Sequence, residues 1–198
     1  MSEISHEIHQ DIQWYPGHIA KVRRQLEERI KLLDVLLVVL DARLAETTYN
    51  TEVLAPLLQK EKPVLWVLNK ADLSDPEVTQ EWLKRYEARA GLAVSYSAKT
   101  AGGSKRILAA LEKLGEPTWK KMEKKGLKRR PLRIGVIGMP NVGKSTVINS
   151  LFGKRRVATG DKAGVTRGLS WLRLSPQFEL MDSPGLIPPK LGSKCRTH

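Results

Sequence analysis

Residues 138–145 have the glycine spacing of a loop that can bind phosphate. They read Gly-Met-Pro-Asn-Val-Gly-Lys-Ser and follow an apolar run at 132–137. In such a loop, backbone N–H groups point at one phosphate and the start of the next helix adds positive potential. We expect Lys144, a catalytic group, to bridge the β- and γ-phosphates, and the Ser145 hydroxyl to bind Mg²⁺. The expected phosphate-binding residues are Asn141, Val142, Gly143, Lys144, Ser145 and Thr146.

A second motif with phosphate chemistry, Asp-Ser-Pro-Gly, occupies 182–185. Asp182 would hold Mg²⁺, through water, and the Gly185 N–H would meet the γ-phosphate. Such a tetrapeptide alone is more often an ordinary turn, but its position after the glycine loop favours a switch segment. Thr166, a catalytic candidate, would bind Mg²⁺ through its hydroxyl only while the γ-phosphate is present, with Thr159 as the alternative.

The segment 69–72, Asn-Lys-Ala-Asp, suits a guanine base. Guanine presents an N1–H and a 2-amino group that one carboxylate, Asp72, can accept together, whereas adenine would leave that carboxylate unpaired. Asn69 would join this loop to the phosphate loop and touch the base, and the Lys70 stem would cover a face of the base. Backbone N–H groups of 97–99 would meet the guanine O6. The expected base-binding residues are Asn69, Lys70, Ala71, Asp72, Ser97, Ala98 and Lys99.

The order of these motifs is unusual. In the common GTP-binding domain the phosphate loop comes first, near the N-terminus, and the base-recognition loop follows. Here the segment 69–72 precedes the segment 138–145. The sequence therefore predicts a GTP-binding domain whose motifs are circularly permuted.

The elements that must position these motifs alternate between strand and helix. The expected strands are Val35–Leu40, Val64–Leu68, Leu92–Tyr96 and Leu132–Ile137, with a hairpin of Leu169–Leu174 and Phe178–Met181. The expected helices are Ile19–Leu33, Glu52–Gln59, Pro76–Ala90, Lys105–Leu114 and Lys144–Phe152, with a turn-rich segment at 47–50. This alternation predicts an α/β fold, a doubly wound and mostly parallel six-stranded sheet.

Charge and cysteine usage limit the partners and the compartment. The 198 residues carry a formal net charge of +13, which favours a polyanionic partner. Eight basic residues and one acidic residue lie between Lys120 and Arg133, as expected for either a solvated linker or an RNA contact. The single cysteine, Cys195, and the absence of a secretory or membrane-spanning pattern indicate a reducing, cytoplasmic location.

Together these motifs resemble the circularly permuted GTPases, in particular the ribosome biogenesis GTPase A (YlqF) family. Residues 14–21, Trp-Tyr-Pro-Gly-His-Ile-Ala-Lys, look like the N-terminal signature of that family, and residues 41–43, Asp-Ala-Arg, also fit. The resemblance covers about Trp14 to Lys190. It implies a GTP-hydrolysing factor in late assembly of the large ribosomal subunit, with ribosomal RNA as partner and neither a membrane nor DNA expected.

The resemblance also implies details of turnover. Leu186 and Ile187 stand where Ras-like enzymes place a glutamine that orients water, so hydrolysis should be slow without the ribosome. His18 is the substitute that the family suggests, or else a turn residue that only helps to dock the N-terminal helix. Asn141 resembles the asparagine that helps bind K⁺ in potassium-activated members.

The expected organisation is a tail and amphipathic helix over 1–33, a GTP-binding domain over 34–190 with a basic linker at 115–131, and a short tail over 191–198. The family continues with a C-terminal helical domain, which residues 191–198 do not provide. We therefore expect a C-terminally short product. The alternative function is a nucleotide-holding, ribosome-binding module with negligible turnover.

Overall fold

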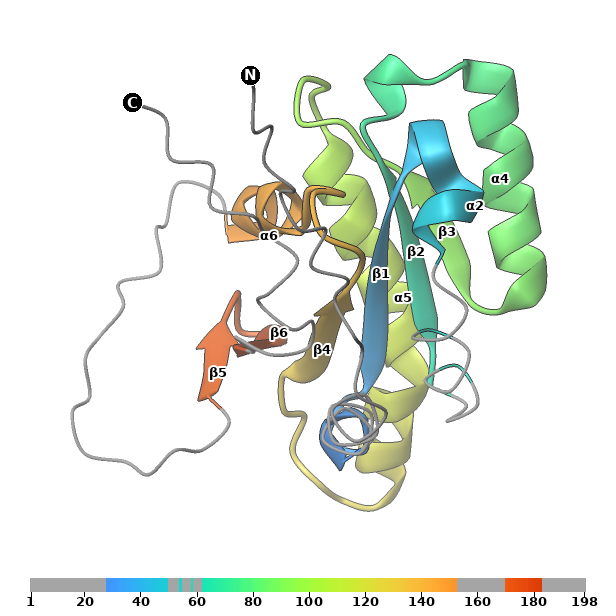
Figure 1. The fold of residues 1–198 in the computed structure, drawn as a ribbon. Helices are drawn as coiled ribbons and strands as arrows, with labels where there is room; N and C mark the ends of the chain where they lie inside the picture. The colour runs from blue at the N-terminus through green and yellow to red at the C-terminus, as the bar shows by residue number, and fades with distance from the viewer. Residues whose placement is uncertain (1–27, 50–53, 55–57, 59–61, 153–169, 183–198) are drawn as a thin grey trace, which may run out of the picture.

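The protein is described by a computed structural model that covers residues 28–49, 54, 58, 62–152 and 170–182. Its centre is a six-stranded sheet in the order β3-β2-β1-β4-β6-β5 (Figure 1). The strands are β1 (Val35–Asp41), β2 (Val64–Asn69), β3 (Leu92–Ser95), β4 (Leu132–Ile137), β5 (Ser170–Arg173) and β6 (Phe178–Asp182). All pairings are parallel except that of β5 with β6. The sequence-based fold class is confirmed.

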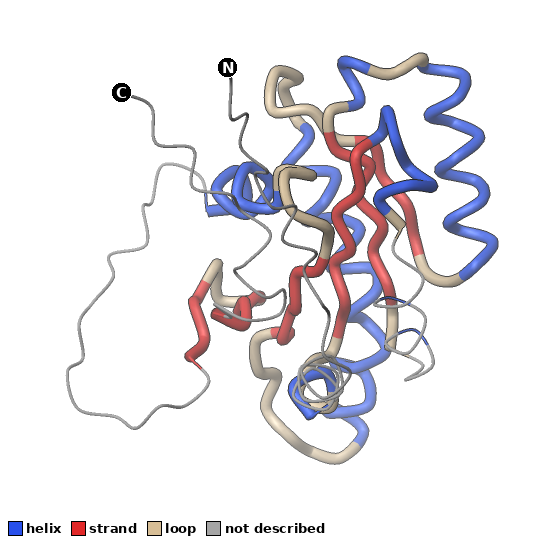
Figure 2. The backbone as a smooth tube through the Cα atoms, in the orientation of Figure 1, coloured by secondary structure: helices blue, strands red, loops and turns tan. Residues whose placement is uncertain are grey.

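Helices cover both faces of the sheet (Figures 1 and 2). The elements outside the sheet are the 3₁₀ turns η1 (Ala42–Leu44) and η2 (Ala71–Leu73) and the helices α2 (Ala45–Thr48), α4 (Pro76–Arg89), α5 (Gly103–Lys124) and α6 (Lys144–Phe152). Every residue of β1 is buried because alternate side chains enter two different cores. Leu36 and the residues two and four positions after it pack with α4. Leu37 and the residues two positions before and after it pack with α5 and α6.

The start of α4 agrees with its sequence signal. The Asp75 carboxylate accepts hydrogen bonds from the N–H groups of Glu77 at 2.8 Å and Val78 at 3.1 Å. Pro76 occupies the first helical turn, where its missing N–H costs nothing.

Helix α5 corrects one expectation. We expected it to end at Leu114, before Gly115 and Pro117, but it continues to Lys124. Pro117 lies on the exposed side, while Gly115 faces β4 so closely that a Cβ there would be 2.8 Å from Leu132. The apolar stripe then continues to Trp119, which is 7% exposed. Burial of this side chain offsets the local cost of proline in a helix.

Three further segments were expected to be a turn or a helix. Thr47 and Thr48, expected in a turn, instead lie in the short helix α2. The expected helices at 19–33 and 52–59 lie largely outside the described residues. In the part of the chain that the structure describes, no helix has the length and apolar character needed to cross a membrane.

Candidate nucleotide-binding site

Four parallel strands, β1 to β4, end at the same edge of the sheet, and the candidate residues follow their carboxyl ends (Figure 1). In open α/β sheets, ligands bind in the crevice outside this edge. The contributing loops are 41–43, 69–72, 97–99 and 138–146. Segments far apart in the sequence therefore meet here.

The phosphate loop joins β4 to α6 and requires glycine at two points. A Cβ on Gly138 would lie 2.4 Å from the Val39 carbonyl oxygen. Gly143 has a φ of +92°, and a Cβ there would lie 2.2 Å from the Asn69 amide nitrogen. Both a positive φ and close approach exclude other residues at position 143. The loop is thus built against the ends of β1 and β2.

Lys144 begins α6 and is half-buried. Its ammonium donates to the carbonyl oxygens of Gly138 at 2.9 Å and Met139 at 2.7 Å. Burial lowers the pKa of Lys144 because it disfavours the charged form. Ser145 and Thr146 are exposed in the first turn of the helix, where a phosphate or a hydrated cation can reach them.

Asn69 and Lys70 connect the base-recognition loop to the phosphate loop. The buried Asn69 amide donates to the Val142 carbonyl at 2.7 Å, across 73 positions of the sequence, and its oxygen accepts from the Lys70 N–H at 2.8 Å. Lys70 has a φ of 60°, and its ammonium donates to the Asn141 carbonyl at 2.9 Å. The expected connection through Asn69 is therefore present.

Asp72 and the segment 97–99 form the wall of a pocket beside this connection. The Ser97 hydroxyl, and after it the Lys99 ammonium at 3.2 Å, holds the pKa of the Asp72 carboxyl below its usual range. The Ala71 N–H donates to the Tyr96 carbonyl at 3.1 Å, which ties the two loops together. The pocket has a volume of about 180 Å³ and is lined by Asn69, Lys70, Asp72, Leu73, Ser97, Ala98, Lys99, Gly143 and Thr146.

Asp41 belongs to this site, although in the sequence it stands out only as part of the family signature at 41–43. Its carboxylate is 5% exposed, accepts from the Arg43 guanidinium at 2.9 and 2.7 Å, and accepts from the Lys70 ammonium at 2.8 Å. These cations, Arg43 first, hold the pKa of Asp41 well below its usual range. The signal in the sequence is an acidic residue at the end of a wholly apolar strand, followed by Arg two positions later. Asp41 positions Lys70 against the phosphate loop.

Of the remaining candidate site residues, the structure describes only Asp182. Asp182 ends β6, which runs parallel to β4, so its backbone lies at the same edge as the phosphate loop. His18, Thr166 and Gly185 lie outside the described residues. The described residues contain no cluster of three or more His, Cys, Asp or Glu that could hold a metal. Mg²⁺ at a nucleotide does not need one, because phosphates, water and one or two protein oxygens such as Ser145 Oγ complete its shell.

The chain is similar to known GTPases. A family model described as "50S ribosome-binding GTPase" matches residues 133–197, beginning at β4 and including the phosphate loop. Ribosome biogenesis GTPase A of Bacillus cereus is 41% identical over 182 residues, which are 90% of this chain and 60% of that protein. Ribosome biogenesis GTPase A of Priestia megaterium is 40% identical over 180 residues, 90% of this chain and 62% of that protein.

A solved structure shows the same architecture. GNP-bound YlqF from T. maritima superimposes with a TM-score of 0.55 and 25% identity, over 83% of this chain and 57% of that one. The chain thus spans about 60% of the length of the relatives that it matches. The inverted motif order, the joined loops and these similarities agree: they support a GTPase of the ribosome biogenesis GTPase A (YlqF) family, whose motif order is circularly permuted.

Proposed function

We propose that this chain binds GTP at the carboxyl edge of the sheet, hydrolyses it to GDP and phosphate, and acts in assembly of the large ribosomal subunit through ribosomal RNA. The observation that carries the proposal is the 2.7 Å bond from Asn69 to the Val142 carbonyl. It fixes a base-recognition loop beside a phosphate loop, as one nucleotide requires. The relatives named for ribosome biogenesis and the family described as ribosome-binding support the cellular role.

Guanine selectivity rests on Asp72. An aspartate carboxylate is charged at neutral pH, so both oxygens can accept the N1–H and 2-amino groups of guanine. The Lys70 stem, held by Asp41 and the Asn141 carbonyl, is available to cover one face of the base. Adenine offers neither donor, so the carboxylate would lose water on binding without gaining the two hydrogen bonds that guanine supplies.

The phosphates would be held by the N–H groups of 141–146 and by Lys144. Phosphate oxygens would replace the Gly138 and Met139 carbonyls as partners of the Lys144 ammonium and raise its pKa again. Ser145, Thr166 and Asp182 would hold Mg²⁺, which neutralises charge on the β- and γ-phosphates when bound. The Gly185 N–H would contact the γ-phosphate, Asn141 would help to hold K⁺, and His18 would orient the attacking water on the ribosome.

The base-recognition step is tested by Asp72→Asn. An amide donates where the carboxylate accepts, so this variant should lose GTP affinity by about a thousandfold and gain affinity for xanthosine triphosphate, which carries a carbonyl in place of the 2-amino group. Titration of fluorescent nucleotides measures both. Asp75→Asn is the matched control, because asparagine caps α4 as well as aspartate does. Tight ATP binding without preference for GTP would remove the proposal.

Turnover is tested separately. GTP hydrolysis should be slow alone, faster in K⁺ than in Na⁺, and faster again with large subunits, while His18→Ala should lose only the stimulation by subunits. If no salt and no subunit stimulates hydrolysis although GTP binds, the chain is the nucleotide-holding, ribosome-binding module instead.

A further inference from the structure

The amino edge of the sheet, opposite the nucleotide site, carries a dense group of cations. Four of the eight basic residues between 120 and 133 contact carboxylates, namely Lys120, Arg129, Arg130 and Arg133. The other four are exposed and form no ion pair with any described residue, namely Lys121, Lys124, Lys125 and Lys128. We call these four lysines together with Arg129 and Gln177 the amino-edge surface.

The end of α5 fixes where these cations lie. Gly126 has a φ of +67°, and its N–H donates to the Glu123 carbonyl at 2.9 Å. The Leu127 N–H donates to the Met122 carbonyl at 3.0 Å. This pair of bonds is the Schellman pattern, which satisfies the last carbonyls of a helix and sets the direction of the following chain.

The segment after the helix is fixed at its other end as well. Arg130 contacts both carboxylate oxygens of Asp34, at 2.6 and 2.9 Å, and the Arg133 N–H donates to the same carboxylate at 2.8 Å. The Trp119 indole N–H donates to the Arg130 carbonyl at 3.1 Å. Lys128 and Arg129 therefore project from a backbone that is held at both ends, and a ligand orders little of it on binding.

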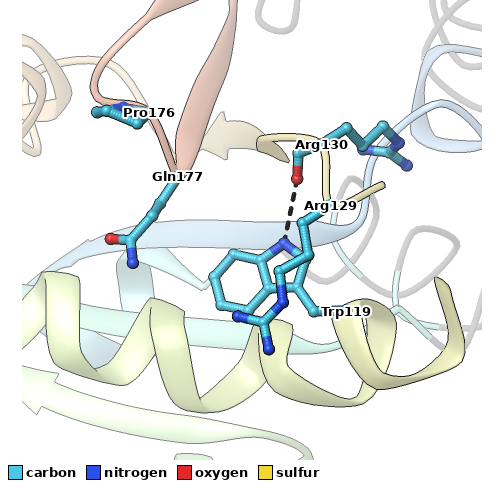
Figure 3. A pocket seen from close by; sticks show the side chains of 5 residues that line it. All are labelled: Trp119, Arg129, Arg130, Pro176 and Gln177. Carbon is cyan, nitrogen blue, oxygen red and sulfur yellow. Dashed lines mark hydrogen bonds between the residues drawn. The ribbon is translucent and has the colours of Figure 1, made fainter. Parts of the chain in front are cut away.

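A small pocket lies within this surface (Figure 3). Its lining residues are Trp119, Arg129, Arg130, Pro176 and Gln177, and the Arg129 guanidinium is also ion-paired with Glu123. The Arg129 guanidinium lies 5.7 Å from the centre of the Trp119 ring, while the Arg130 side chain points away (Figure 3). At about 60 Å³ the pocket is a third of the size of the base pocket, too small for a nucleobase but sufficient for a phosphate group.

We propose that the amino-edge surface binds the sugar–phosphate backbone of an RNA, with one phosphate between Arg129 and Gln177. Exposed lysines on a fixed backbone release counterions from a polyanion at little entropic cost. The choice of RNA among polyanions rests on the proposed function, whereas the location comes from the charge and geometry described here. RNA and nucleotide would then occupy opposite edges of the sheet and bind at the same time.

The test compares two triple variants of the full chain. Lys124→Gln/Lys125→Gln/Lys128→Gln removes charge from the amino-edge surface. Lys84→Gln/Lys105→Gln/Lys113→Gln removes the same charge from exposed helical lysines elsewhere. The probe is a fluorescent RNA hairpin from the large subunit, titrated by anisotropy at several salt concentrations. The first variant should lose at least tenfold in affinity, and its salt slope should fall by about 2, while the control should change by less than threefold.

The outcomes are distinct. Equal losses in both variants would show that only net charge matters, and no loss in either would remove the surface from RNA binding. Retention on anionic lipid vesicles in place of RNA would also overturn the proposal. Gln177→Ala should weaken RNA binding by about threefold, the value of one hydrogen bond, with Gln80→Ala as control. GTP binding measured on the same samples separates failure of this proposal from failure of the nucleotide site.

Discussion

The two edges of the sheet hold positive charge in different ways. At the carboxyl edge Lys70, Lys99 and Lys144 each donate to a carboxylate or carbonyl of another loop or of their own loop. At the amino edge Lys121, Lys124, Lys125 and Lys128 follow one another along the end of α5 and the segment after it, and none of the four forms an ion pair with a described residue. The first arrangement fixes a few groups around one small anion, and the second suits an extended polyanion. The same residue type thus serves two recognition problems, according to what contacts it.

A matched pair of glycines gives the largest expected contrast between the edges. Gly143→Ala places a Cβ 2.2 Å from the Asn69 amide at a φ of +92° and should lower GTP affinity by at least about a hundredfold, since displaced catalytic loops lose that much. Gly126→Ala also places a side chain on a residue with positive φ, but nothing lies within 4 Å of the new Cβ. It should cost about 1 kcal/mol in unfolding free energy and leave GTP affinity unchanged. Nucleotide titration and urea unfolding measure both, and equal effects on GTP would contradict the contrast.

Two carboxylates, the buried Asp41 and the partly buried Asp34, sharpen the comparison. Asp41→Asn leaves the Arg43 and Lys70 cations without their charge partner and should cost about 2 to 3 kcal/mol in unfolding free energy. It should also weaken GTP binding, because Lys70 loses its position. Asp34→Asn should cost a similar amount through Arg130 but leave GTP affinity intact. If both variants bind GTP equally well, Asp41 has no role in positioning Lys70.

A fall in pH should destabilise the protein through carboxylates at the carboxyl edge of the sheet. The pKa of Asp41 and that of Asp72 are depressed by neighbouring donors and cations. A carboxylate with a depressed pKa contributes stability that is complete above its unfolded pKa of about 4 and is lost as the pH falls toward the folded pKa. Unfolding free energy measured in urea should therefore decrease below pH of about 4, and less steeply in Asp41→Asn. Parallel pH profiles would rule out Asp41 as a source of this dependence.

The smallest effect is expected at the amino edge. Trp119→Phe keeps an aromatic ring against Phe178 but removes the N–H that donates to the Arg130 carbonyl. We expect a loss of about 1 kcal/mol in unfolding free energy, a modest loss of RNA affinity, and no change in GTP affinity. A change in GTP affinity would mean that the two edges are coupled through α5.

The sequence predicted those parts whose signal is local. The apolar runs predicted the strands, and the glycine spacing at 138–145 predicted a loop between β4 and α6. The extension of α5 past Pro117 could not be predicted, because the apolar partner of Trp119 comes from β6, far along the chain. The hydrogen bond from the Lys70 ammonium to the Asp41 carboxylate joins residues 29 positions apart in the sequence. These residues lie at the ends of β2 and β1, and only the parallel register of the two strands brings them together.

The bond between Asn69 and Val142 also has a consequence for synthesis of the protein. A chain that is synthesised from its N-terminus exposes the residues of β1, β2 and β3 before those of β4. Until residue 142 has left the ribosome, the Asn69 amide lacks its acceptor and the base-recognition loop lacks its support. In the unpermuted order the phosphate loop would instead be made first and wait for the base loop. Here β4 is the last strand to enter the centre of the sheet, and its arrival completes the proposed nucleotide site.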